Sequence, residues 1–243
     1  MGSTPPVERL KNIFLLPGDI RLSEFEQELP HLWTDCLQRK MRGYLGTTAI
    51  SDAVNFAATE VKADFVFYDI GPNIGPLNRV ILLDCDFFVV PAACDLFSTR
   101  ALSTLGHSLS SWIKDWQVVT KLAPDNVRLL PGMPKFLGYI LQRFRMYGGT
   151  ISGSFAPYVA ALEKAAHNDI AVVLRRVDKD LASAAVSYNK IGQVKDFGGL
   201  ATLSQEQGAP FRSVEGGGVE QKRDADAEFD RIAKLILQRT AKE

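Results

Sequence analysis

The sequence predicts an α/β fold built on a mainly parallel, doubly wound sheet, and three stretches of the chain carry that prediction. Residues 64–68 form an apolar run that ends in Asp69 and is followed at once by Gly71 and Pro72. Such a run, bounded by turn residues, is typical of a strand buried on both faces. Residues 87–90 and 136–142 repeat the pattern. Segments with helical spacing lie between these runs, as in the βαβ units of parallel sheets.

The N-terminal third of the chain adds a short strand and two helices. Residues 12–16 predict the strand. Ser23 and Glu26 have the spacing of a capping box, in which a serine and a glutamate three residues later satisfy the first amides of a helix. We therefore expect a helix to begin there. Residues 47–62 predict a second helix, because their apolar side chains recur on one helical face.

The remainder of the chain continues the alternation of helices and strands. Helices are expected at residues 78–84, 96–116 and 224–239, and within residues 155–167 and 180–190. Residues 210–214 predict a final edge strand. We expect residues 1–243 to form a single α/β domain that is incomplete at its N-terminus, with residues 1–11 flexible.

Composition limits the classes of function. The chain of 243 residues is 46% hydrophobic and 23% charged, and its formal net charge is zero. Bulk charge therefore favours no polyanionic partner. Cys36, Cys85 and Cys94 lack metal-ligand spacing, and buried thiols in a reducing cytoplasm are the expected interpretation. No run approaches the ~18 apolar residues of a membrane span, so we predict a cytoplasmic protein without a membrane partner.

The sequence that follows the first apolar run resembles that of a known family. It reads Asp69-Ile70-Gly71-Pro72-Asn73-Ile74-Gly75-Pro76-Leu77-Asn78-Arg79, and Asp95-Leu96-Phe97-Ser98 follows the second run. Together these motifs resemble a ParA-like subgroup of the ParA/MinD partition ATPases, which are P-loop proteins of the deviant Walker A type. The resemblance covers the chain from about Asn12 onward. It implies a sheet of the P-loop NTPase type, truncated at the N-terminus.

The resemblance also implies roles for particular residues. Asp69 corresponds to the Walker B-type acid, the catalytic residue that holds Mg²⁺ through water, if a P-loop is supplied. Gly71, Pro72 and Asn73 correspond to a switch loop that senses the bound nucleotide. Gln142 and Arg143 end the third apolar run, where the family places residues near the base. Residue chemistry leaves other interpretations open: a helix-capping role for Asp69, and a surface loop for Gln142 and Arg143. Asp95 is expected to cap the following helix. Arg79 is either a solvated or ion-paired side chain or a contact to nucleotide or partner.

The phosphate-binding half of the family signature is missing. A P-loop needs Gly-x-x-x-x-Gly-Lys-[Ser/Thr], because backbone amides wrap the phosphates and the lysine reaches them. No Gly-Lys-Thr or Gly-Lys-Ser occurs in the sequence. ATP and Mg²⁺ are the family's cofactors, but we expect this chain to bind neither by itself and not to hydrolyse ATP by itself. In the resembled fold the P-loop strand lies between the Asp69 strand and the strand at residues 87–90. We therefore expect the gap to be closed by direct pairing of those two strands, by another segment of the chain or by a second chain.

Two functions follow from the resemblance. The first is a nucleotide-binding, ATP-gated dimer that segregates plasmids or chromosomes in bacteria with a ParB-type partner protein. The second is a non-enzymatic ParA-like scaffold that binds a partner protein or DNA. Whether the chain is an enzyme stays open. Non-specific DNA contacts in this family use basic residues, and the candidates here are Arg143, Arg145, Arg175 and Arg176. The alternative for these arginines is an ordinary surface of mixed charge.

Overall fold

The computed structural model describes residues 5–147 and 150–241. These residues form two compact units. The first comprises the chain up to Asp86 together with Ser111–Pro134, and the second comprises Phe87–Ser110 together with the chain from Lys135 onward. The division falls within helix α4 (Leu96–Lys121), whose residues belong partly to each unit. None of the described helices is long and apolar enough to cross a membrane.

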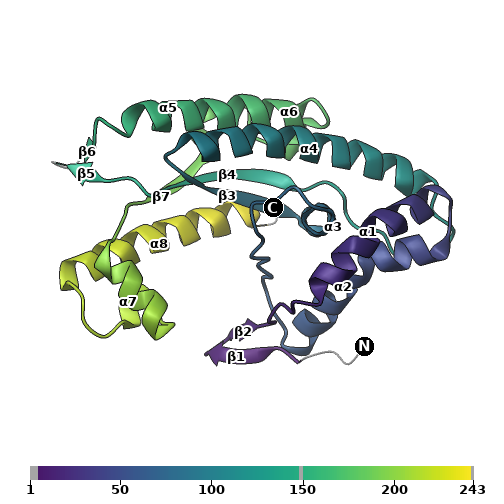
Figure 1. Ribbon diagram of the computed structural model, residues 1–243, viewed down its shortest axis with the longest axis horizontal. Helices are drawn as coiled ribbons and strands as arrows, with labels where there is room; N and C mark the ends of the chain where they lie inside the picture. Colours follow the sequence, from purple (N-terminus) through teal and green to yellow (C-terminus); the bar gives the residue numbers. More distant parts are fainter. Residues whose placement is uncertain (1–4, 148–149, 242–243) are drawn as a thin grey trace. The chain divides into compact units, whose positions relative to one another are not determined.

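The first unit joins a small hairpin to a group of helices (Figure 1). Strands β1 (Val7–Leu10) and β2 (Ile13–Leu15) pair antiparallel. Residues 1–4, part of the segment that was expected to be flexible, lie outside the described residues. The helices of this unit, besides the end of α4, are α1 (Leu22–Leu37), α2 (Met41–Glu60) and α3 (Pro76–Asp84).

Buried aromatic side chains hold these helices together. The hydroxyl of Tyr44 in α2 donates to the carbonyl oxygens of Cys36 at 2.9 Å and Val119 at 3.2 Å. Trp116 of α4 donates its indole N–H to the Leu130 carbonyl at 3.0 Å. Both rings are almost completely buried. Each buried polar atom thus has a partner, which is the condition for placing a tyrosine or a tryptophan inside a core.

The capping box predicted for α1 does not form. The helix begins at Leu22 with Arg21 at the cap position, and no side chain caps it. Ser23 lies in the first turn and donates to the Ile20 carbonyl. Glu26 instead accepts a hydrogen bond from the backbone of Leu77, at the start of α3. The contact of Glu26 with Leu77 thus replaces the local capping interaction that its spacing from Ser23 predicts.

The second unit contains a parallel sheet of three strands in the order β3-β4-β7. The strands are β3 (Phe87–Ala93), β4 (Lys135–Gln142) and β7 (Lys190–Val194). One face carries the first part of α4 and the helical stretch α5 (Ala156–Ala165), η1 (Ala166–Ala171) and α6 (Val172–Arg175). Helix α8 (Val219–Thr240) covers the other face (Figure 1). Most residues of β4 are buried, as is typical of a strand covered on both faces.

Shorter elements complete the second unit. They are β5 (Met146–Tyr147), β6 (Thr150–Ile151), η2 (Lys179–Leu181), η3 (Val186–Asn189), α7 (Gly199–Gln207) and η4 (Phe211–Ser213). Strands β5 and β6 pair antiparallel. Leu137, Ile191 and Ile232 form a buried cluster between the sheet and α8.

The predicted doubly wound sheet of the P-loop NTPase type is wrong. The strands predicted at residues 87–90 and 136–142 are confirmed as β3 and β4, but residues 64–68 belong to no sheet. The parallel sheet therefore has three strands, and the other described strands form two-stranded antiparallel pairs. A strand needs a neighbour to satisfy its backbone donors and acceptors. Within the described residues, no segment pairs with residues 64–68.

Three local assignments in the second unit also change. The edge strand predicted at residues 210–214 is the short 3₁₀ turn η4. The helix predicted within residues 180–190 is replaced by the 3₁₀ turns η2 and η3. Strand β7 follows directly, in a stretch for which no strand was predicted. Only two of the five residues of β7, Ile191 and Val194, are large and apolar, so its sequence carries little of the apolar signal that reveals β3 and β4.

Close packing between α4 and the π-helical segment η1 gives a test of this unit. Gly106 of α4 lies against the backbone of Asp169, and an added Cβ would overlap that carbonyl. Helix propensity alone favours alanine over glycine by ~1 kcal/mol. We nevertheless expect Gly106→Ala to lower the free energy of unfolding by about 1–3 kcal/mol, because the backbone has to shift. Urea unfolding measures the change.

The matched control is Gly199→Ala in α7, where an added Cβ has no neighbour within 4 Å. We expect that substitution to be neutral or slightly stabilising. If Gly106→Ala raised stability as much as Gly199→Ala, the close packing of α4 on η1 would be wrong.

Candidate functional site

The candidate site is the segment that leads from α2 into α3 and carries the Asp69 motif. Residues 64–70 have extended or irregular backbone with no regular secondary structure. Phe65, Val66 and Phe67 are 49%, 47% and 80% exposed. Three consecutive large apolar side chains are therefore open to solvent just before Tyr68 and Asp69, and Asp69 is itself exposed.

Tyr68 fixes the path of this segment. Its hydroxyl donates to Asp84 Oδ2 at 2.7 Å. Ser51 Oγ donates to the other carboxylate oxygen at 2.5 Å, and Arg128 Nη2 donates to Ser51 Oγ at 2.8 Å. Burial and the adjacent Asp84 carboxylate raise the pKa of Tyr68 above its ordinary value. The phenol therefore stays protonated and keeps its donor role throughout the neutral range.

Asn78 fixes the other end of the motif. It is buried, and its Nδ2 donates to the carbonyl oxygens of Gly71 at 2.7 Å and Asn73 at 2.8 Å. Asn73 Oδ1 lies 2.6 Å from the same nitrogen. Gly75 precedes α3, where a Cβ would overlap Glu26 Oε1. One buried amide thus holds the loop, and Gly75 leaves room for the Glu26 carboxylate that accepts from the Leu77 amide at the start of α3.

These two anchors present the predicted switch residues on one loop. Asp69, Gly71, Pro72 and Asn73 are all exposed between Tyr68 and Asn78. Among the described residues, Asp69 forms no ion pair, and no group of three or more metal-ligating side chains comes together. The arrangement offers one carboxylate and loop backbone groups to an incoming molecule.

Gln142 and Arg143 belong to the second unit, at the C-terminal end of β4. The Gln142 carbonyl accepts a hydrogen bond from Cys94 at 3.2 Å. Arg143 is exposed and has a positive φ of 56°, which is uncommon for a residue with a side chain. Asp95 caps α4, as predicted, because its Oδ1 accepts from the Ser98 amide at 2.6 Å.

The four arginines proposed for DNA lie in two pairs. Arg143 and Arg145 are exposed just before β5. Arg175 ends α6 and donates to the carbonyl oxygens of Lys179 and Ala182, so it closes a turn, while Arg176 is exposed. The continuous helix from α5 to α6 starts close to β6 (Figure 1) and spans residues 156–175, about 30 Å at 1.5 Å per residue. The structure therefore does not gather the four side chains into one basic surface.

Arg79 takes the ion-paired role that the sequence left open. Its guanidinium carbon lies 3.2 Å from the centre of the Trp33 ring, and Nη2 lies 3.6 Å from Asp115 Oδ2. Burial lowers the pKa of Arg79 to about 10. The Trp33 and Trp116 rings lie 5.3 Å apart. Arg79 thus links α3 to α1 and α4 within the core of the first unit, and it remains charged at neutral pH.

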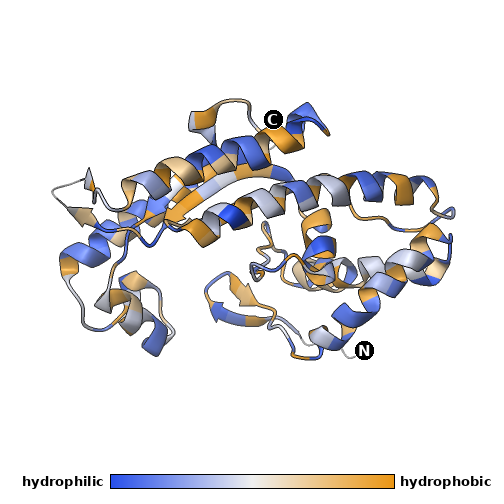
Figure 2. Cartoon of the chain, turned by 45° about the horizontal axis from the view of Figure 1, so that its top comes forward, coloured by the Kyte–Doolittle hydropathy of each residue, from blue (hydrophilic) through white to orange (hydrophobic). Residues whose placement is uncertain are grey.

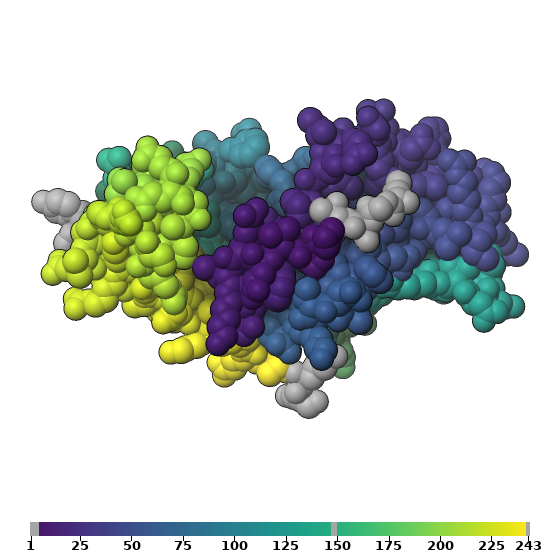
Figure 3. All heavy atoms as spheres, turned by 90° about the horizontal axis from the view of Figure 1, so that it is seen from below, coloured from purple at the N-terminus to yellow at the C-terminus, as the bar shows by residue number. Residues whose placement is uncertain are grey.

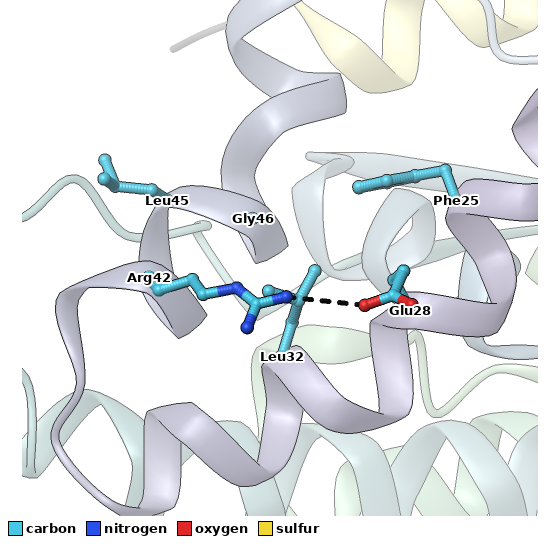
Figure 4. Close-up of a pocket in the computed structure, with 6 residues that line it drawn as sticks. All are labelled: Phe25, Glu28, Leu32, Arg42, Leu45 and Gly46. Carbon is cyan, nitrogen blue, oxygen red and sulfur yellow. Dashed lines mark hydrogen bonds and ion pairs between the residues drawn. The ribbon is translucent and has the colours of Figure 1, made fainter.

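A separate groove lies between α1 and α2 (Figure 4). Its volume is about 530 Å³, and Phe25, Leu32, Leu45 and Gly46 supply its apolar lining. Arg42 and Glu28 also line it and pair with each other at 3.5 Å. The groove combines an apolar surface with mutually neutralised charges, and none of its lining residues belongs to the Asp69 loop.

Comparisons with known proteins bear on the fold. No protein-family model matches the chain, and no curated protein sequence matches it. The structure is similar to the crystal structure of protein DIP2308 from Corynebacterium diphtheriae, with a TM-score of 0.63 and 20% sequence identity. The match covers 96% of this chain and 68% of that chain. At this identity the similarity concerns the fold alone.

Sequence reasoning found the Asp69 loop but missed the side chains that hold it. Ser51, Asp84 and Arg128 meet around Tyr68 from positions as much as 77 residues apart. Glu26 was assigned to its own helix and serves α3 instead. No local spacing connects these residues. The one local signal was Asn78, which lies within the motif itself.

The anchoring role of Asn78 can be tested directly. Asn78→Ala removes the only side chain seen to bridge the Gly71 and Asn73 carbonyls in the described part of the chain. We expect the free energy of unfolding to fall by about 1–3 kcal/mol and amide exchange of residues 69–75 to accelerate. The exposed Asn168→Ala is the control. Unchanged exchange in Asn78→Ala would contradict the anchor.

Because the four candidate arginines lie in two separate pairs, we predict that DNA binding is weak. With only Arg143 and Arg145 close in sequence and exposed, about two phosphates would be neutralised, which gives a salt slope near −2. Fluorescence anisotropy against a random duplex should show an affinity that disappears near physiological salt and falls further in R143A/R145A. Tight binding at physiological salt, or a preference for one sequence, would contradict this expectation.

Proposed function

We propose that this chain is a ParA-like binding module that engages a partner macromolecule and does not turn over ATP by itself. The observation that carries the proposal is the Asp69 loop. Its sequence resembles the motif of that family, and it is held by the partly buried Tyr68 at one end and the buried Asn78 at the other, while its own residues face solvent. Rigid anchoring of an exposed loop is typical of a recognition element, because binding then costs little ordering.

The chemistry of the loop favours binding over phosphoryl transfer. Catalysis on a nucleotide needs cationic groups that neutralise the transferring phosphate. The motif loop between Asp69 and Gly75 supplies no lysine or arginine, and Arg79 is occupied by Trp33 and Asp115. A lone carboxylate repels phosphate unless a cation lies between them.

A partition ATPase is the second candidate, and one observation favours it. The exposed Asp69 carboxylate is free of ion pairs among the described residues, so it can reach the water of a Mg²⁺ ion brought in with ATP. Under this proposal another polypeptide supplies the phosphate-binding loop. The dimer, the ParB-type partner and the cytoplasmic location of the family would then extend to this protein.

Steady-state ATP hydrolysis by the chain alone tests the proposed binding module. We expect the chain with Mg²⁺ and ATP to release phosphate at the rate of buffer, because it lacks a phosphate cradle. The decisive variants are Asp69→Ala and, as a control, Asp125→Ala at another exposed carboxylate. Turnover that is lost in Asp69→Ala and kept in Asp125→Ala would overturn the binding module and favour the ATPase.

A further inference from the structure

From the residues that precede Asp69, we infer the chemistry of the partner: an extended apolar strand with basic residues at both ends, which pairs with residues 64–68. The inference rests on the proposed binding function and names its ligand. It starts from the backbone. Within the described residues, no main-chain hydrogen bond joins residues 64–70 to another segment, and no strand lies in register with them. A backbone outside any sheet, with its donors and acceptors open, is available for strand addition.

The side chains of the segment fit the same partner. Phe65 and Phe67 stack with ring centres 6.4 Å apart, so they share one face of the extended chain. Tyr68 lies on the alternate face and is tied to Asp84. The segment is thus anchored by Tyr68 on one face, where Val66 is nevertheless 47% exposed, and it is open on the face of Phe65 and Phe67. An added strand would place aromatic or β-branched residues beside Phe65 and Phe67, which is the stabilising unit of a sheet.

A neighbouring apolar surface extends this face. Figures 1 and 3 show the hairpin of β1 and β2 beside the chain that leaves α2, and both lie in the first unit. Leu10, Ile13 and Leu15 of the hairpin are 54%, 57% and 45% exposed. In Figure 2, β2 is orange. Exposed apolar side chains that lie together are typical of a surface that binds a partner.

Charge decides which strand fits. Asp64 and Asp69 are exposed at the two ends of the segment, and neither forms an ion pair among the described residues. Antiparallel pairing of residues 64–69 with the same residues of a second copy would set Asp64 opposite Asp69 of that copy, and parallel pairing in register would set each aspartate beside itself. Like charges directly opposite destabilise a sheet. A strand of another polypeptide with lysine or arginine at both ends complements the segment in either direction.

Fluorescently labelled peptides test the inference in anisotropy titrations with the full chain. The probe is Lys-Lys-Ile-Val-Phe-Val-Lys-Lys. One comparison peptide has glutamate in place of the four lysines, and another has proline in place of both valines. We expect the basic peptide to bind about threefold to tenfold more tightly than the acidic one at low salt. The proline peptide should bind at least about tenfold more weakly, because proline lacks the amide donor that a sheet needs.

Matched variants test whether the peptide binds at residues 64–69. Phe67→Ser should weaken the basic peptide about tenfold, while Phe97→Ser, at a similarly exposed aromatic in the second unit, should leave affinity within about twofold. D64N/D69N should abolish the preference for basic ends, and Asp125→Asn should keep it. Circular dichroism confirms that each variant is folded. Hydrogen exchange should slow at residues 64–68 when the peptide binds, which adsorption on an apolar surface would not cause.

Several results would overturn the strand inference. They are equal loss of binding in Phe67→Ser and Phe97→Ser, equal affinity for the proline peptide, exchange at residues 64–68 that the peptide does not slow, or no binding of the basic peptide. A dimer that light scattering detects and Phe67→Ser dissociates would assign the face to a second copy. Failure of the proposed function is distinguishable, because ATP turnover that depends on Asp69 would overturn it whether or not peptides bind.

Discussion

The carboxylate of Asp84 is the group on which the presentation of Asp69 depends. It accepts one hydrogen bond from Tyr68 and one from Ser51, and Arg128 reaches the same serine. A segment outside any sheet has no ladder of backbone hydrogen bonds, so side chains have to fix its path. Asn78 does so from the far end by binding two loop carbonyls. Between these anchors the chain can hold a defined shape while its outer face remains open to solvent.

The three apolar runs show why sequence could predict part of this fold and not the rest. Periodicity and composition report that a segment is suited to burial in a sheet. They do not report whether a neighbouring strand exists. β3 and β4 find each other and are covered by helices on both faces, so their prediction was confirmed. Residues 64–68 carry the same signal without a partner, and the predicted doubly wound sheet failed at that point.

Sequence likewise predicts one part of the candidate site and not the other. The loop from Asp69 to Asn78 could be located from its own residues, because glycine, proline and asparagine mark turns through local backbone chemistry. Its supports could not be located. Glu26 illustrates the difficulty, since its spacing from Ser23 satisfies a local rule, yet the Leu77 amide competes for the carboxylate and binds it. Arg175 is a similar case, in which a cation suited to phosphate binds two backbone carbonyls.

The eleven residues from Asp69 to Arg79 thus form an ordered loop and the start of α3 in a fold that the surrounding sequence does not predict. The Asp69 loop needs only a buried asparagine, a glycine beside Glu26 and a tether at Tyr68, and the first unit supplies all three. What the loop does then depends on the surface next to it. Burial of apolar area is worth roughly 25 cal/mol per Å², so the exposed side chains of Phe65, Val66 and Phe67 provide a driving force for association that Asp69 alone does not. In this segment residues 65–67 therefore provide the driving force for association, and the adjacent Asp69 carries the chemistry of the motif.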